Sequence, residues 1–230
     1  AEFAISTEET RYYLNGIYFH ATDAEGTKIL RAVATDGHRL ARVEAPLPDG
    51  AENMPGVIVP RKTVGELRKL IEETGEAVDI AMSDTKIRFG FGKAVLTSKL
   101  IDGTFPDYER VIPSGNDKTL DIECKAFADA VDRVSAISIE KSRAVKVVMS
   151  GNTLTLSASS PEHGTASEEL EINYDADDIE IGFNSRYLLD IAKQVKGDTL
   201  NLLMSDGSSP TILRDTDDLS ALYVLMPMRV

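Results

Sequence analysis

The feature that most constrains the fold is an internal repeat relating the two halves of the chain. An apolar run at 57–59 followed by a helical pattern over 61–73 matches a run at 181–183 followed by a helical pattern over 185–196. The tetrapeptides beyond the two helices also match: they are Ala81-Met82-Ser83-Asp84 and Leu203-Met204-Ser205-Asp206. A repeat of this length predicts duplicated domains rather than a solenoid, whose units are shorter.

Local patterns predict hairpins alternating with helices. Apolar residues at helical spacing predict helices over 61–73, 125–139 and 184–196. Short apolar and β-branched runs separated by turn residues predict strands. These runs are 11–14, 17–19, 28–33, 40–43, 57–59, 78–82, 86–91, 94–100, 120–124, 145–149, 153–157, 167–172, 179–183 and 222–226.

The centre of the chain is rich in turn-forming residues. Gly, Pro and Asp gather over 102–108, and Pro, Ser, Gly and Asn follow over 113–117. We therefore expect a first domain at 1–103, a linker at 104–116 and a second domain at 117–230.

Composition excludes several classes of protein. The single cysteine, Cys124, allows no intrachain disulfide framework and no multi-cysteine metal site, and it suits a reducing cytosol. No run approaches the about 18 apolar residues that a membrane helix needs. We expect a soluble, cytoplasmic chain. Because it opens without Met or a recognisable domain start, we also expect it to be the remainder of a longer protein.

The charges are unevenly distributed along the chain. The net charge is −13, which argues against nucleic acid at long range. Across 61–73, 125–143 and 184–196, however, there are 11 Lys and Arg against 7 Asp and Glu, and the remainder has 14 against 31. Basic helix faces on an acidic body fit two interpretations: an ordinary solvated surface, or a surface that attracts phosphate on one side.

The stretch 34–41 predicts a tight hairpin with polar residues beyond its turn. Asp36-Gly37 is a strong turn signal, because Gly accepts positive φ and Asp bonds its own backbone. His38 and Arg39 would then lie at a binding rim. A hydrolase using Asp36 and His38 is an alternative, but the sequence has no nucleophile elbow, so a turn Asp and a hydrogen-bonded rim His are favoured.

Other chemical motifs are weak. The sequence has no HExxH or CxxC, and Gly90-Phe91-Gly92-Lys93 lacks the spacer and Ser or Thr of a phosphate loop, so it is interpreted as a hairpin. The run 223–230 places two methionines around Pro227. Methionine suits a groove that accepts several partners, and ordinary core filling is the alternative.

Several strings together resemble the bacterial sliding clamp, the beta subunit of DNA polymerase III. The resemblance covers the whole chain in order. It rests on residues 34–41, 105–113 and 223–230, and on Arg11-Tyr12-Tyr13-Leu14-Asn15-Gly16, Val59-Pro60-Arg61-Lys62, Thr97-Ser98-Lys99-Leu100 and Phe183-Asn184.

The resemblance implies an α+β fold of duplicated clamp domains. In that family a subunit has three similar domains, each with antiparallel sheets outside and two helices on the inner, DNA-facing side, and two subunits close a ring around duplex DNA. This chain resembles the middle and last domains, without the first strand and helix of the middle one. The usual ring interface joins a first domain to a last domain, so the chain alone is not expected to close a homodimeric ring.

The resemblance also implies two sets of functional residues. Sequence-independent, salt-sensitive contacts to DNA phosphates are expected from Arg61, Lys62, Arg68, Lys69, Arg133, Lys193 and Lys196. A pocket between the two domains is expected to bind short linear motifs of polymerase subunits, the clamp loader and repair proteins. Its wall is Leu14, Thr35, Gly37, His38, Arg39, Leu40, Pro106, Arg110, Val111, Val224, Leu225, Met226, Pro227, Met228 and Arg229, and Asn184 and Tyr187 extend it.

The function implied is therefore a non-enzymatic processivity factor with no cofactor. A peptide-binding scaffold that never encircles DNA is the main alternative, and ring closure separates the two.

Overall fold

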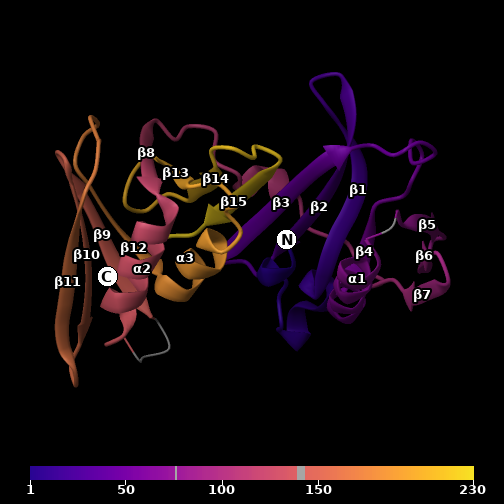
Figure 1. Ribbon diagram of the computed structural model, residues 1–230, viewed down its shortest axis with the longest axis horizontal. Helices are drawn as coiled ribbons and strands as arrows, with labels where there is room; N and C mark the ends of the chain where they lie inside the picture. The colour runs from indigo at the N-terminus through magenta and orange to yellow at the C-terminus, as the bar shows by residue number, and fades with distance from the viewer. Residues whose placement is uncertain (76, 139–142) are drawn as a thin grey trace. The chain divides into compact units, whose positions relative to one another are not determined.

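The computed structural model describes residues 1–75, 77–138 and 143–230, which form two compact units (Figure 1). Unit 1 is Ala1–Tyr108 and unit 2 is Glu109–Val230. A short 3-10 helix, η3 (Tyr108–Val111), lies at the division. The expected linker at 104–116 spans this division, and its bounds stay predictions.

The described residues of unit 1 form strands of two antiparallel sheets and one α-helix. The first sheet has the strand order β4-β1-β2-β3 and the second the order β5-β6-β7. The strands are β1 (Gly16–Ala24), β2 (Thr27–Thr35), β3 (Arg39–Pro46), β4 (Val57–Pro60), β5 (Asp79–Met82), β6 (Lys86–Phe91) and β7 (Ala94–Lys99). The helices are α1 (Arg61–Thr74) and two short 3-10 helices, η1 (Glu2–Ala4) and η2 (Glu9–Leu14).

The helix α1 joins the two sheets of unit 1 through a shared core. Ile87, Phe89 and Phe91 of β6 are buried together with Val57 and Val59 of β4. The partly buried side chains packed on this cluster are Phe19, Val64, Leu67, Leu70, Val78, Met82, Ala94, Leu96 and Leu100. Of the apolar residues whose spacing predicts this helix, Val64, Leu67 and Leu70 form the stripe of α1 that faces the sheets, whereas Ile71 is exposed.

The described residues of unit 2 form strands of two antiparallel sheets and two α-helices. One sheet has the order β11-β10-β9-β12 and the other contains β15-β14-β13-β8. The strands are β8 (Lys118–Glu123), β9 (Ala144–Ser150), β10 (Thr153–Ser160), β11 (Gly164–Glu171), β12 (Ile179–Asn184), β13 (Thr199–Met204), β14 (Thr211–Asp215) and β15 (Ala221–Leu225). The helices are α2 (Cys124–Ser135) and α3 (Ser185–Ala192).

The helices of unit 2 pack on each other and begin at side-chain caps. Phe127, Leu188 and Ile191 are fully buried between helices and sheets. The Glu123 carboxylate accepts hydrogen bonds from the backbone N–H of Lys125 and Ala126, and it thereby caps the first turn of α2. Such a cap satisfies amides that the helix itself leaves without a partner.

Three sequence-based boundaries are wrong. Residues 11–14 form the end of η2 rather than a strand, because Ser6 N–H bonds the Leu14 carbonyl and Asn15 N–H bonds the Tyr12 carbonyl in a compact turn. The helix predicted to reach residue 196 ends at Ala192. The helix predicted over 125–139 ends at Ser135, and residue 139 itself lies outside the described residues.

The internal repeat is confirmed in the order of elements. In unit 1, β4 leads into α1 and then β5, β6 and β7; in unit 2, β12 leads into α3 and then β13, β14 and β15. The fold is thus α+β with antiparallel sheets and few helices, as expected. Among the described residues, no helix is both long and apolar enough to cross a membrane.

Candidate functional site

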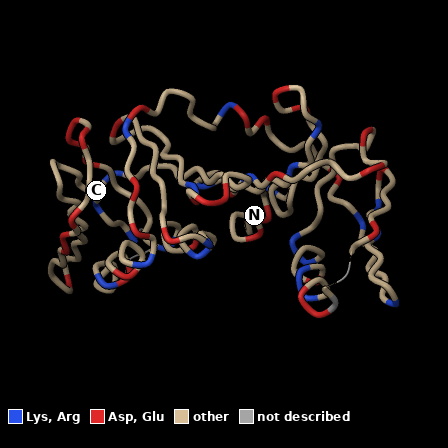
Figure 2. The backbone as a smooth tube through the Cα atoms, turned by 45° about the horizontal axis from the view of Figure 1, so that its top comes forward, with Lys and Arg blue, Asp and Glu red and all other residues tan. Residues whose placement is uncertain are grey.

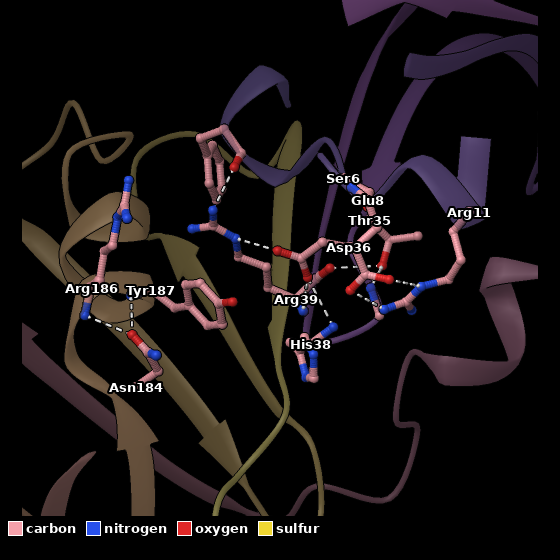
Figure 3. A network of polar contacts seen from close by, with 12 residues as sticks. Ser6, Glu8, Arg11, Thr35, Asp36, His38, Arg39, Asn184, Arg186 and Tyr187 are labelled. Carbon is pink, nitrogen blue, oxygen red and sulfur yellow. Dashed lines mark hydrogen bonds and ion pairs between the residues drawn. The ribbon is translucent and has the colours of Figure 1, made fainter. Parts of the chain in front are cut away.

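The turn between β2 and β3 is held by its own side chains. The Asp36 carboxylate accepts hydrogen bonds from the backbone N–H of His38 at 2.9 Å and of Arg39 at 3.0 Å. Thr35 Oγ1 accepts from Gly37 N–H and donates to the Arg39 carbonyl at 2.7 Å. Gly37 has φ +88°, which favours glycine. The Asp36 carboxylate thus serves the turn, as expected for a turn residue, and His38 is exposed beyond it (Figure 3).

Arg39 is turned back onto its own chain. Its Nε lies 3.1 Å from Asp36 Oδ2, and its Nη2 donates to the Phe3 carbonyl at 2.7 Å (Figure 3). The guanidinium also lies 5.2 Å from the centre of the Phe3 ring. These contacts tie η1 to the start of β3 and fix the guanidinium of this predicted wall residue between Asp36 and Phe3.

Two residues that the sequence did not assign to the predicted wall lie beside the same turn. Glu8 and Arg11 form a two-point contact, with Arg11 Nε and Nη2 at 2.7 Å and 2.6 Å from the carboxylate oxygens. A Cβ on Gly37 would lie 2.6 Å from Arg11 Nη1, so a side chain there would displace Arg11. The hydrogen bond from Arg11 lowers the pKa of Glu8. The spacing of three residues between Glu8 and Arg11 is the sequence signal that could have predicted this ion pair.

Pro106 lies between two anchored aromatic residues. The Phe105 ring stacks on Tyr18, with ring centres 5.0 Å apart. The Tyr108 hydroxyl lies 3.0 Å from His20 Nε2 and accepts from Arg31 Nη1 at 3.2 Å. Both aromatic side chains are buried in unit 1, whereas Pro106 is exposed. Phe105 and Tyr108 therefore hold the exposed proline in place.

In unit 2, the last residues of the chain lie against β12. Met228 N–H donates to the Gly182 carbonyl at 2.9 Å, and these two residues form an isolated β-bridge. Met226 is 41% exposed, whereas Val224 and Leu225 are buried in the core. The segment 226–230, here called the tail, thus presents methionine side chains from a backbone that β12 fixes.

The remaining predicted wall residues have varied surroundings. Asn184 is the N-cap of α3, where its Oδ1 accepts from the N–H of Arg186 at 3.0 Å and of Tyr187 at 3.3 Å (Figure 3). Leu14 and Leu40 are buried in unit 1, with exposures of 4% and 2%. The exposed residues of the predicted wall are Gly37, His38, Pro106, Arg110, Val111, Met226 and Arg229.

The helices are less basic than the sequence predicts. Within α1, α2 and α3 as observed there are 7 Lys and Arg against 6 Asp and Glu. Lys193 and Lys196 lie beyond the end of α3, and Arg143 lies outside α2. Figure 2 shows both signs of charge following each other along the helices. The predicted surplus of cations therefore came mainly from overextended helix bounds.

The predicted DNA-facing cations fall into two groups. Arg68 lies 3.2 Å from Glu2, Lys69 lies 3.1 Å from Glu66, and Arg133 Nη2 lies 2.5 Å from Glu168. The other predicted cations have no ion pair within the described residues; they are Arg61, Lys62, Lys193 and Lys196. In the same described ranges, no group of three His, Cys, Asp or Glu is placed to hold a metal ion.

Family models and relatives agree on the identity of both units. The model of the DNA polymerase III beta subunit, central domain, matches residues 1–107, and that of its C-terminal domain matches 109–229. The beta sliding clamp of Caulobacter vibrioides is 55% identical over 228 residues, covering 99% of this chain and 61% of the relative. That of Escherichia coli K12 is 38% identical over 231 residues, covering 100% of this chain and 61% of the relative.

Solved clamp structures match the fold along the whole chain. A sliding clamp from Bartonella birtlesii bound to griselimycin has a TM-score of 0.97 at 54% identity, covering 100% of this chain and 62% of that one. A Caulobacter crescentus beta sliding clamp has a TM-score of 0.95 at 55% identity, with the same coverage. The chain thus spans about 61% of the length of its curated relatives. It belongs to the DNA polymerase III beta subunit family, of which it contains the central and C-terminal domains.

Proposed function

We propose that the chain works as the central and C-terminal part of a bacterial sliding clamp, which tethers the replicative polymerase and other replication and repair proteins to duplex DNA in the cytoplasm. The observation that carries the proposal is the match of both family domains over residues 1–107 and 109–229. Members of the family are non-catalytic processivity factors, which argues against the alternative that this chain is a hydrolase using Asp36 and His38. Ring closure as a homodimer is proposed for the full-length protein and not for this chain alone.

We further propose that the wall residues predicted from sequence, supplied by both units, bind partner linear motifs. Exposed apolar side chains support this role, because Val111 is 48% exposed and Met226 is 41% exposed. Large apolar groups at a surface suit an apolar anchor of a partner. The Bartonella clamp binds griselimycin, and the Caulobacter clamp holds polyethylene glycol at a proposed tethering region for beta motifs.

Met228→Ala is expected to weaken binding of a labelled clamp-motif peptide about tenfold, because truncating an apolar anchor costs about 1–2 kcal/mol. Fluorescence anisotropy measures the effect. Leu219→Ala is the matched control, since Leu219 is 71% exposed on a turn of unit 2 outside the predicted wall. Unchanged affinity after both Met228→Ala and removal of 226–230 would refute the peptide site.

For DNA, the cations without intrachain ion pairs are the strongest candidates. A phosphate that binds Arg68 or Arg133 has to compete with Glu2 or Glu168 for the guanidinium. Arg61 and Lys62 at the start of α1 have no such competitor within the described residues. We propose that these two residues contribute more to duplex binding than the paired cations do.

Arg61→Gln/Lys62→Gln is expected to weaken binding of a random-sequence duplex about fivefold at low salt. Its salt dependence, as the slope of log K against log salt, should fall by about 1–2, since each phosphate contact contributes about 0.9. Lys86→Gln/Lys99→Gln removes the same charge from the β6–β7 sheet and should leave duplex binding nearly unchanged. If the two variants lost the same affinity for the duplex, the effect would come from net charge alone, and a special role of Arg61 and Lys62 would be contradicted.

A further inference from the structure

One segment of unit 1 departs sharply from the acidic character of the chain. Residues 85–100 contain Lys86, Arg88, Lys93 and Lys99 and no Asp or Glu, whereas the whole chain has a net charge of −13. This segment forms the hairpin of β6 and β7. Lys86, Arg88 and Lys99 therefore lie on one small sheet, and Lys93 lies in the turn that joins its strands.

The geometry of this hairpin directs its cations to one face. Ile87, Phe89 and Phe91 alternate along β6 and are buried against the core that α1 covers. Lys86 and Arg88, between them, are exposed. Side chains alternate between the two faces of a strand, so Lys86 and Arg88 lie on the face opposite α1.

The register of the hairpin sets the pattern on this face. Lys86 is paired with Lys99, Arg88 with Thr97, and Gly90 with Val95. These pairs form three rows, here called the basic strip, separated by about 7 Å along the strands. Val95 is 54% exposed beside a glycine, so the third row offers a small apolar spot.

No described residue forms an ion pair with the cations of the basic strip. Like charges directly opposite on neighbouring strands are destabilising, yet Lys86 and Lys99 are such a pair. Within the described ranges, the side chains of Lys86, Arg88 and Lys99 have no hydrogen bond or ion pair. In contrast, Arg31 and Arg39 on neighbouring strands of the first sheet are paired with carboxylates.

The surroundings favour one kind of ligand. Single-stranded nucleic acid binds on exposed aromatic platforms, but Phe89 and Phe91 are buried, with exposures of 3% and 2%. An extended peptide has the same repeat as a strand, so carboxylates at alternate positions match the rows. Beside Lys86 and Lys99 is a hollow of about 600 Å³ that Asp84 and Asp102 also line. These two carboxylates repel a peptide carboxylate inside the hollow, so we expect the carboxylates of a peptide over the rows instead.

We propose that the basic strip is a docking surface for an extended acidic peptide segment of a partner protein, with carboxylates over the Lys86–Lys99 and Arg88 rows and an apolar residue beside Val95. The strip lies on the face of β6 and β7 opposite α1, so it is separate from the cations proposed for duplex DNA.

The test is binding of a fluorescent hexaglutamate peptide to the 230-residue chain. Lys86→Gln/Arg88→Gln/Lys99→Gln is expected to weaken binding at least about tenfold, at up to about 1 kcal/mol for each exposed charge pair. Lys28→Gln, an exposed cation of β2 outside the strip, should have little effect. Because the triple variant removes a repulsive pair, its melting temperature should equal or exceed that of the parent, so a binding loss is not a folding loss.

Four results would overturn the proposal. The first is that hexaglutamate does not bind at low salt, and the second is that the triple variant and Lys28→Gln lose the same affinity for it. The third is that the melting temperature of the triple variant falls enough to explain its loss of binding. The fourth is that a thymidylate oligonucleotide binds more tightly than hexaglutamate and loses affinity in the triple variant to the same extent. Binding of the clamp-motif peptide reports separately on the proposed function and should be the same in the parent and the triple variant.

Discussion

Gly182→Val is expected to abolish binding of a clamp-motif peptide, with a loss of about a hundredfold or more, equivalent to about 2.7 kcal/mol. A Cβ at Gly182 would come within 3.0 Å of the Met228 carbonyl oxygen and would lie 2.5 Å from Val230 Cγ1. Real Cβ atoms do not approach that closely, so the tail has to leave β12. Met226, Pro227 and Met228 would then lose their fixed positions together, which costs more than any single truncation among them.

The tail prediction separates positioning from folding. The core of unit 2, including Phe183 and Leu188, is buried independently of the tail, so thermal unfolding should change much less than peptide binding does. Gly115→Ala is the control, because a Cβ there meets no atom within 4 Å. Hydrogen exchange at the Met228 amide should become fast in Gly182→Val. Persistent protection of that amide together with unchanged peptide affinity would contradict the mechanism.

Local signals predicted much of the fold. The Asp36-Gly37 turn, the helix α1 and the repeated strand–helix order depend on interactions between near neighbours, and all three are confirmed. Residues 11–14 were misassigned because Tyr and Leu favour strands, while the bond from Ser6 N–H to the Leu14 carbonyl closes a compact turn. Both partners of that bond are backbone atoms, so the residue types at positions 6 and 14 do not predict it.

The candidate site was less predictable, for a similar reason. The sequence marks Arg39 as a polar rim residue, but its guanidinium bonds a backbone carbonyl 36 positions away, at Phe3. Any residue can supply a carbonyl, so no side-chain pattern reveals the partner. The contact of the tail with Gly182 is also made by backbone atoms. The sequence around Gly182 predicts only a strand, and nothing in it indicates that the tail packs closely against this glycine.

Asp215→Asn is expected to destabilise unit 2 by about 2–4 kcal/mol at pH 7, because a buried carboxylate with several hydrogen bonds is replaced by an amide that cannot accept them all. Asp215 is 4% exposed. Its carboxylate accepts from the backbone N–H of Lys196 at 2.8 Å, Gly197 at 3.0 Å and Asp217 at 2.9 Å. It thus joins the segment after α3 to the turn between β14 and β15. Urea unfolding measures the loss.

The control for this substitution is Asp175→Asn, which makes the same chemical change at an exposed position of unit 2. It should alter the free energy of unfolding by less than about 0.5 kcal/mol. A loss below about 1 kcal/mol in Asp215→Asn would mean that the three amides find other acceptors, which would contradict a structural role for this carboxylate.

The pH dependence of the Asp215 contribution has a definite sign. Burial alone would raise the pKa of Asp215, but hydrogen bonds from the backbone amides of Gly197, Asp217 and Lys196 outweigh burial and lower the pKa below its ordinary value. A lowered pKa in the folded state gives stability that is fully present above the unfolded value of about 3.9 and is lost as the pH falls through the folded value. The difference in unfolding free energy between the parent and Asp215→Asn should therefore be constant from pH 7 to about pH 5 and shrink below about pH 4. Other acidic groups titrate in both proteins and cancel in the difference; one is Asp206, whose pKa is lowered to about 2 by hydrogen bonds from Ser208 and Ser209. If this difference in unfolding free energy stayed constant down to pH 2, the charge of Asp215 would contribute nothing to stability, and only the shape of its side chain would matter.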